Sequence, residues 1–121
     1  MARFRLSRPA QTDLARILSA SLEQWGAEGK RRYAVTLATA MRKLASDPQG
    51  TGTRDRGELQ PGLRSLHLRY AGARRRDAQV RRPVHVLYYR VIRAGLVEIV
   101  RILHERMEPA RWLETGSGPE E

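Results

Sequence analysis

Two apolar runs near the C-terminus constrain the fold of this chain most strongly. Residues 84–91 and 96–103 are rich in Val, Ile, Leu and Tyr, and a short connection containing Gly95 joins them. This pattern is typical of a β-hairpin. Apolar side chains occupy both faces of each run, as expected of strands in the interior of a sheet. The chain must therefore build a sheet around this hairpin.

Two further segments alternate between apolar and polar residues, which is typical of strands with one solvated face. In residues 3–7, Phe4 and Leu6 share one face. In residues 63–70, Leu66, Leu68 and Tyr70 share one face. We expect both segments to flank the inner hairpin.

Helical periodicity fills the region between these flanking strands. Ser7 and Pro9 indicate a helix start, and apolar residues at spacings of three and four then continue to a break near Gly26. A second periodic run ends at Asp47 and Pro48, because proline cannot extend a helix. The stripes comprise Leu14, Ile17, Leu18, Leu22 and Trp25, then Tyr33, Leu37, Ala40, Met41 and Leu44. These residues predict an antiparallel helix hairpin.

The remaining segments complete a single α+β domain over residues 1–114. Residues 48–62 lack periodicity and are expected to form a surface loop. A short C-terminal helix is expected to start near Pro109. Either this helix, with Trp112 and Leu113, or a partner protein is expected to cover the second sheet face. Residues 115–121 are expected to form a disordered tail.

From its composition we expect a cytoplasmic protein, and its charge is compatible with anionic partners. The chain has 121 residues, no cysteine and a net charge of +10 from 23 basic and 13 acidic residues. Absence of cysteine fits a reducing compartment. No apolar window approaches the roughly 18 residues that a membrane span needs, so we expect no membrane association. The positive charge favours polyanions such as DNA, RNA or acidic proteins.

The basic charge is densest in the connection at residues 71–82, which we expect to form a hairpin loop. Five arginines against one aspartate give a net charge of +4 there. A basic loop can lie along a phosphate backbone, although many such loops are only solvated. The candidate nucleic-acid contacts are Arg74, Arg75, Arg76, Arg81 and Arg82.

The order of four motifs along the chain resembles a known protein family. They are Trp25-Gly26, then residues 59–66 (LQPGLRSL), then residues 88–91 (YYRV), then residues 98–109 (EIVRILHERMEP). Together with the expected elements, they resemble the ParE branch of the RelE/ParE toxins of type II toxin-antitoxin systems. The resemblance covers about residues 3–113. The basic connection and the Gly/Glu tail depart from the family pattern.

This resemblance implies the RelE/ParE-like fold. The expected order is an N-terminal strand, an antiparallel helix hairpin, a three-stranded antiparallel meander and a short C-terminal helix. It also implies a toxin that inhibits DNA gyrase by protein contact, has no active site of its own and is held inactive in a hetero-oligomer with a ParD-like ribbon-helix-helix antitoxin. The expected target-binding residues are Arg101, His104, Arg106 and Met107.

Two alternatives stay open at the level of sequence. RelE-like relatives cut messenger RNA on the ribosome, and fold alone cannot choose between these mechanisms. A ribonuclease would need cations and an acid or base, for which Arg64, Arg90, His104 and Arg106 are the candidates. The other alternative is a basic nucleic-acid-binding module that uses the connection at residues 71–82.

Antitoxin binding is assigned to the ends of the helical stripes, where Trp25, Tyr33 and Met41 are candidates for partial exposure.

We expect no metal or cofactor. His67, His85 and His104 lie on three different strands without the i, i+4 spacing of a helical metal site.

Overall fold

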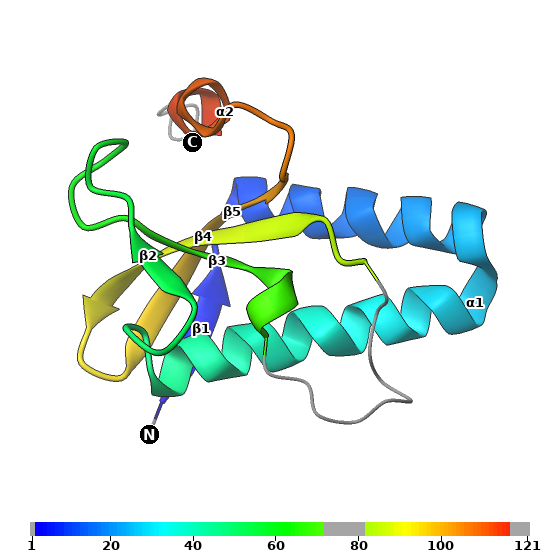
Figure 1. The fold of residues 1–121 in the computed structure, drawn as a ribbon, viewed down its shortest axis with the longest axis horizontal. Helices are drawn as coiled ribbons and strands as arrows, with labels where there is room; N and C mark the ends of the chain where they lie inside the picture. Colours follow the sequence, from blue (N-terminus) through cyan, green and yellow to red (C-terminus); the bar gives the residue numbers. More distant parts are fainter. Residues whose placement is uncertain (1, 72–81, 117–121) are drawn as a thin grey trace.

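The computed structural model describes residues 2–71 and 82–116. Figure 1 shows their elements in the order β1 (Arg3–Leu6), α1 (Arg8–Ser46), β2 (Thr53–Asp55), β3 (Arg64–His67), the 3₁₀ helix η1 (Leu68–Tyr70), β4 (His85–Arg93), β5 (Leu96–His104) and α2 (Pro109–Gly116). No helix among these residues has the length and apolar character needed to cross a bilayer.

The apolar hairpin forms the interior of the sheet, as predicted. The strand order is β1-β5-β4-β3-β2. Strands β3, β4 and β5 are antiparallel neighbours, and β1 pairs with β5 in parallel. Gly95 turns the β4–β5 hairpin at a φ of 82°, a conformation that glycine adopts without steric cost. The predicted α+β architecture is confirmed.

Two local predictions in the middle of the chain were wrong. The expected loop at residues 48–62 contains β2, which pairs with β3 as an additional edge strand. The expected strand at residues 63–70 ends at His67, because the Arg69 amide donates to His67 Nδ1 and the chain turns into η1. Leu66 and Leu68 are buried, whereas Tyr70 is 50% exposed.

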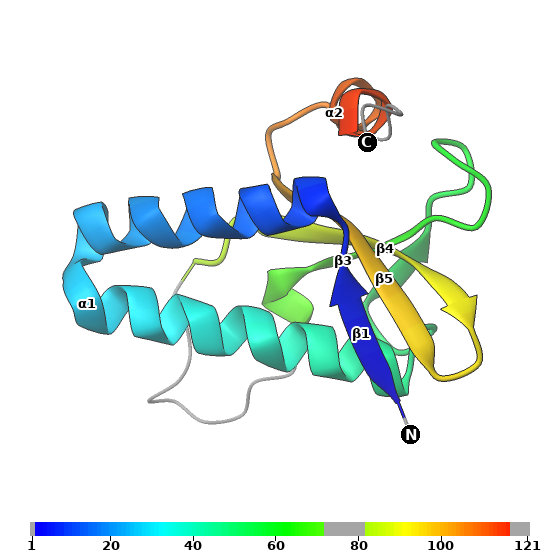
Figure 2. The same cartoon turned by 180° about the vertical axis from the view of Figure 1, so that it is seen from behind.

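Element α1 is a helix hairpin whose two arms run side by side, with the tip pointing away from the sheet (Figures 1 and 2). Ser7 caps its start by accepting a hydrogen bond from the Ala10 amide, which satisfies a free helical N–H. The arms separate at Gly26, whose φ of 78° and ψ of −175° break the helix. The predicted hairpin and its break are confirmed.

The sheet has a hydrophobic core on each face. On the α1 side, the second predicted stripe packs against the sheet through Tyr33, Leu37, Ala40, Met41 and Leu44, which contact Leu66, Leu87, Tyr89, Val97, Ile99 and Ile102. On the other side, α2 contributes Trp112 and Leu113 to a smaller cluster with Leu63, Tyr88, Val100 and Leu103. The C-terminal helix therefore covers part of the second face, as expected.

Helix α2 includes Thr115 and Gly116, the first two residues of the expected tail. The rest of that tail, residues 117–121, lies outside the described residues.

Candidate functional site

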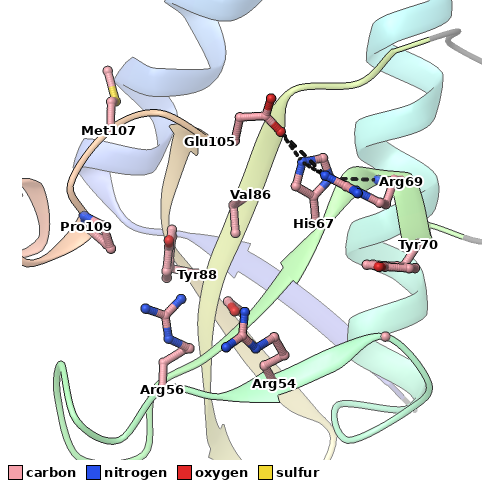
Figure 3. A pocket seen from close by; sticks show the side chains of 12 residues that line it. Arg54, Arg56, His67, Arg69, Tyr70, Val86, Tyr88, Glu105, Met107 and Pro109 are labelled. Atoms are coloured by element: carbon pink, nitrogen blue, oxygen red, sulfur yellow. Dashed lines mark hydrogen bonds and ion pairs between the residues drawn. The ribbon is translucent and has the colours of Figure 1, made fainter.

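A groove of about 650 Å³ lies on the sheet face opposite α1, beside the area that α2 covers. We call it the open-face groove. Figure 3 shows that its side chains come from β2, β3, η1, β4 and the turn after β5. It is lined by Gly52, Arg54, Arg56, Ser65, His67, Arg69, Tyr70, Val86, Tyr88, Glu105, Met107 and Pro109.

The floor and one wall of the groove combine arginine with tyrosine. The Arg56 guanidinium lies 5.7 Å from the centre of the Tyr88 ring and pairs with Glu58 at 2.8 Å. Burial raises the pKa of the Tyr88 phenol, so this side chain stays neutral at physiological pH. Arg54 is exposed and, within the described residues, lies in no ion pair.

The opposite wall is held by a histidine–carboxylate contact. His67 Nε2 lies 2.6 Å from Glu105 Oε1, and His67 Nδ1 accepts from the Arg69 amide at 3.1 Å. Since Nδ1 accepts, the ring proton resides on Nε2 and is donated to Glu105. This hydrogen bond lowers the pKa of Glu105. The Arg69 guanidinium lies 3.7 Å from the same carboxylate oxygen.

The expected target-binding residues divide between the interior and the surface. His104, Arg106 and Met107 lie at the end of β5 and in the following turn; Arg106 is exposed, Met107 is 37% exposed, and Met107 reaches the groove. Arg101 is only 8% exposed and pairs with Asp13. Its guanidinium is therefore not presented on the surface.

The four candidate ribonuclease residues do not converge. Arg64 shares the α1 side of the sheet with its cross-strand neighbour Tyr89, whereas Arg90 faces the other side, because side chains alternate along a strand. His104 lies six positions along β5 from the partner of Arg90, roughly 20 Å at 3.3 Å per residue. One phosphate group could not contact all four side chains.

The local contacts of these candidates also differ. Arg64 donates to Thr53 Oγ1 at 2.8 Å, and Arg90 donates to Gln60 Oε1. The His104 ring packs edge-on against His85, with 5.6 Å between their centres. None of the four lines the open-face groove.

The candidate antitoxin-binding residues also differ in exposure. Trp25 is 57% exposed near the tip of the helix hairpin, beside Leu22 at 45%. Tyr33 and Met41 are buried in the core on the α1 side, at 2% and 4% exposure. Only Trp25 of the three is accessible to a partner in this structure.

The basic connection adds little to the described site. Arg82 is exposed, while Arg74, Arg75, Arg76 and Arg81 lie outside the described residues.

Sequence analysis missed most residues of the open-face groove. Arg54 and Arg56 were assigned to a loop, and Arg69 to the polar face of a longer strand. The spacing of two between Arg54 and Arg56 was the available signal, because residues at i and i+2 share one face of a strand. Three residues of β2 are too few to reveal that period.

Comparisons with known proteins agree with this architecture. The family described as "ParE toxin of type II toxin-antitoxin system, parDE" matches residues 4–109. Toxin ParE1 of Mycobacterium tuberculosis (strain CDC 1551 / Oshkosh) is 32% identical over 110 residues, which are 91% of this chain and 96% of that protein. Toxin ParE1 of Caulobacter vibrioides is 35% identical over 107 residues, which are 88% of this chain and 93% of that protein.

A solved structure has the same fold. It is titled "Chromosomal ParDE TA system from P. aeruginosa" and matches with a TM-score of 0.61 at 21% identity, covering 86% of this chain and 96% of the other. The match to the family over residues 4–109 and the identity with two curated toxins agree with the fold. This chain belongs to the ParE toxin family of type II toxin-antitoxin systems.

Proposed function

We propose that this toxin inhibits DNA gyrase in the cytoplasm through direct protein contact and that a ParD-like ribbon-helix-helix antitoxin neutralises it. One observation favours gyrase inhibition over ribonuclease activity. The candidate ribonuclease residues lie on two faces and at two ends of the sheet: Arg64, Arg90, His104 and Arg106. Acid–base catalysis needs groups within hydrogen-bond reach of one reacting centre. Membership of the ParE family supports the same choice.

The proposed gyrase contact is the turn that follows β5, with His104, Arg106 and Met107. Three hydrogen bonds hold this turn: the Glu105 amide donates to the Val84 carbonyl, the Met107 amide to the His104 carbonyl, and the Arg106 amide to His104 Nδ1. A turn held in this way loses little conformational entropy on binding. An exposed guanidinium beside a thioether suits a protein interface, where Arg and Met are enriched.

The proposed antitoxin contact is the helix hairpin around Trp25 and Leu22. Large exposed aromatic and aliphatic side chains are common anchors in interfaces. The sheet also offers two edges, β1 and β2, to which an extended antitoxin segment could add a strand. The solved neighbour is described as a ParDE system, which supports an antitoxin partner.

The test compares gyrase and ribosome assays on one preparation of the protein. We expect the protein to block supercoiling and to trap cleaved DNA with gyrase, and to leave messenger RNA on programmed ribosomes intact. The double variant R106Q/M107Q should lose at least tenfold in gyrase inhibition, while R16Q on the exposed surface of α1 should retain it. Codon-phased cuts in messenger RNA without gyrase inhibition would establish the ribonuclease alternative instead.

A further inference from the structure

The open-face groove carries a positive charge that the proposed gyrase contact does not use. Its lining residues include three arginines and one glutamate, a net charge of +2 when His67 is neutral. Arg54 and Arg69 are both exposed. Figure 3 shows Arg54 and Arg56 on one side of the groove and Arg69 with His67 across from them. Arg56 is paired with Glu58 at 2.8 Å, and Arg69 lies 3.7 Å from Glu105. An anionic ligand in the groove would therefore meet Arg54 on one side and share Arg69 with Glu105 on the other.

An exposed aromatic ring lies beside these cations. Tyr70 is 50% exposed, and the Arg69 guanidinium lies 5.8 Å from the centre of its ring. The backbone of Gly52 packs so closely that a Cβ atom there would lie 2.7 Å from Tyr70 Cβ. This contact and the hydrogen bond from Lys43 Nζ to the Tyr70 carbonyl, at 3.0 Å, fix the position of Tyr70 on the groove wall.

We propose that the open-face groove binds single-stranded nucleic acid, with Arg54 and Arg69 on consecutive phosphates and an unpaired base stacked on Tyr70. Guanidinium groups match phosphate oxygens in geometry and charge. Cationic grooves with exposed aromatic rings are the common means of binding single strands without sequence preference. The volume, about 650 Å³, lies within the roughly 300–1,000 Å³ typical of small-ligand pockets, which leaves room for one or two nucleotides.

An acidic peptide fits the groove less well. Extended peptides gain much of their affinity from main-chain hydrogen bonds at a sheet edge. The floor of the groove consists of side chains on the inner strands, including Ser65, Val86 and Tyr88. An occupant of this floor meets side chains and not free backbone groups.

The test measures fluorescence anisotropy of the full chain with labelled 12-nucleotide single-stranded RNA and DNA of the same sequence. A hairpin duplex and poly-glutamate serve as competitors. We expect R54Q/R69Q to weaken single-strand binding at least tenfold and to reduce the salt slope by about 1.4, since each lost phosphate contact on a single strand contributes about 0.7. Y70A should weaken binding roughly 5- to 100-fold, while Y70F retains the stacking ring and the affinity.

The matched control is R16Q/R42Q. It removes the same two charges from exposed positions on α1 and leaves the groove intact. The affinity of this control for the single strands should stay within about twofold of that of the unaltered protein. Every variant should have the same thermal unfolding midpoint as the unaltered protein.

Several outcomes would overturn the proposal. If R54Q/R69Q and R16Q/R42Q lost the same affinity for the single strands, the net charge of the protein alone would account for binding. Stronger competition by poly-glutamate or by the duplex would assign the groove to an acidic protein segment or to double-stranded DNA. R54Q/R69Q removes one ion-pair partner of Glu105 but keeps the proposed gyrase contacts His104, Arg106 and Met107. Gyrase inhibition by this variant therefore reports on the gyrase contact separately from single-strand binding.

Discussion

Asp13 and Arg101 form a buried, two-point ion pair that joins the helix hairpin to the centre of the sheet. Arg101 Nε lies 2.7 Å from Asp13 Oδ2, and its terminal nitrogen lies 2.9 Å from Asp13 Oδ1. Asp13 also accepts a hydrogen bond from the Ile102 amide, and Arg101 donates to the Trp112 carbonyl. One charge pair therefore connects α1, β5 and α2.

The first prediction concerns this pair. R101M should lower the free energy of unfolding by about 3–5 kcal/mol, because it leaves a buried carboxylate without its counter-ion. Chemical denaturation followed by circular dichroism measures the change. Since the fold is weakened, R101M should lose antitoxin binding and toxicity together.

The control is the partly exposed surface pair of Arg5 and Glu98, separated by 3.3 Å near the start of β5. R5Q should change the stability by no more than about 1 kcal/mol, as is usual for surface pairs. If R101M were as stable as R5Q but failed to inhibit gyrase, Arg101 would be a contact residue after all.

The second prediction concerns pH. Burial, helped by the neighbouring His104 and His67, lowers the pKa of His85 from 6.5 to about 4. Tyr33 Oη lies 2.6 Å from His85 Nδ1 and accepts from the Val84 amide, so it donates its proton to the neutral ring. The unfolded chain binds a proton on His85 at higher pH than the folded chain does.

His85 should therefore contribute stability that is complete above pH 6.5 and is lost as the pH falls from 6.5 to about 4. The interval corresponds to at most about 3 kcal/mol, and partial exposure of the ring reduces the expected loss to about 1–2 kcal/mol. H85N keeps an acceptor near the Nδ1 position but cannot titrate. Urea denaturation measures the free energy of unfolding, which should depend less steeply on pH over this range in H85N than in the unaltered protein. An equally steep pH dependence in H85N would assign the acid sensitivity to other groups.

The third prediction concerns Gly26. Its φ of 78° and ψ of −175° belong to a region that side-chain-bearing residues rarely adopt. Because a Cβ atom there would meet no atom within 4 Å, the cost of G26A is backbone strain alone, about 1–3 kcal/mol. Thermal unfolding measures it, with E23A on the exposed first arm as the control, expected within about 0.5 kcal/mol. A stable G26A would mean that the arms can separate at another residue.

The fourth prediction tests the antitoxin contact. W25A should weaken binding of the cognate antitoxin at least tenfold, because aromatic anchors dominate interface energies, and should leave stability nearly unchanged at 57% exposure. Isothermal titration calorimetry measures the affinity. V91A removes a comparably exposed apolar side chain from the β4–β5 hairpin, at 45% exposure, and should bind normally. Equal losses for both variants would point to a second contact near Val91.

The fifth prediction concerns the rate of antitoxin binding. The net charge of +10 should steer an acidic antitoxin toward the toxin, so added salt should slow association more than it changes dissociation. Stopped-flow tryptophan fluorescence, from Trp25 and Trp112, follows both rates. An association rate that does not depend on salt would contradict electrostatic steering.

Much of the fold could be predicted from the sequence, because its signals are local. The apolar runs around Gly95 predicted the inner strands, and the spacing of apolar residues on either side of Gly26 predicted the two arms of α1. The break at Asp47 and Pro48 was also correctly located. In each case the period or the turn residue lies within a few positions of the element that it determines.

Tertiary structure decided the residues of the site. Strand β2 forms only because β3 offers it a partner, and it brings Arg54 and Arg56 to the open-face groove. Arg101, by contrast, is buried because Asp13, 88 positions away, pairs with it on the interior strand β5. The sequence by itself determined the two helical arms and the inner strands. Which arginines face solvent was decided by packing, because burial depends on contacts between residues far apart in the chain.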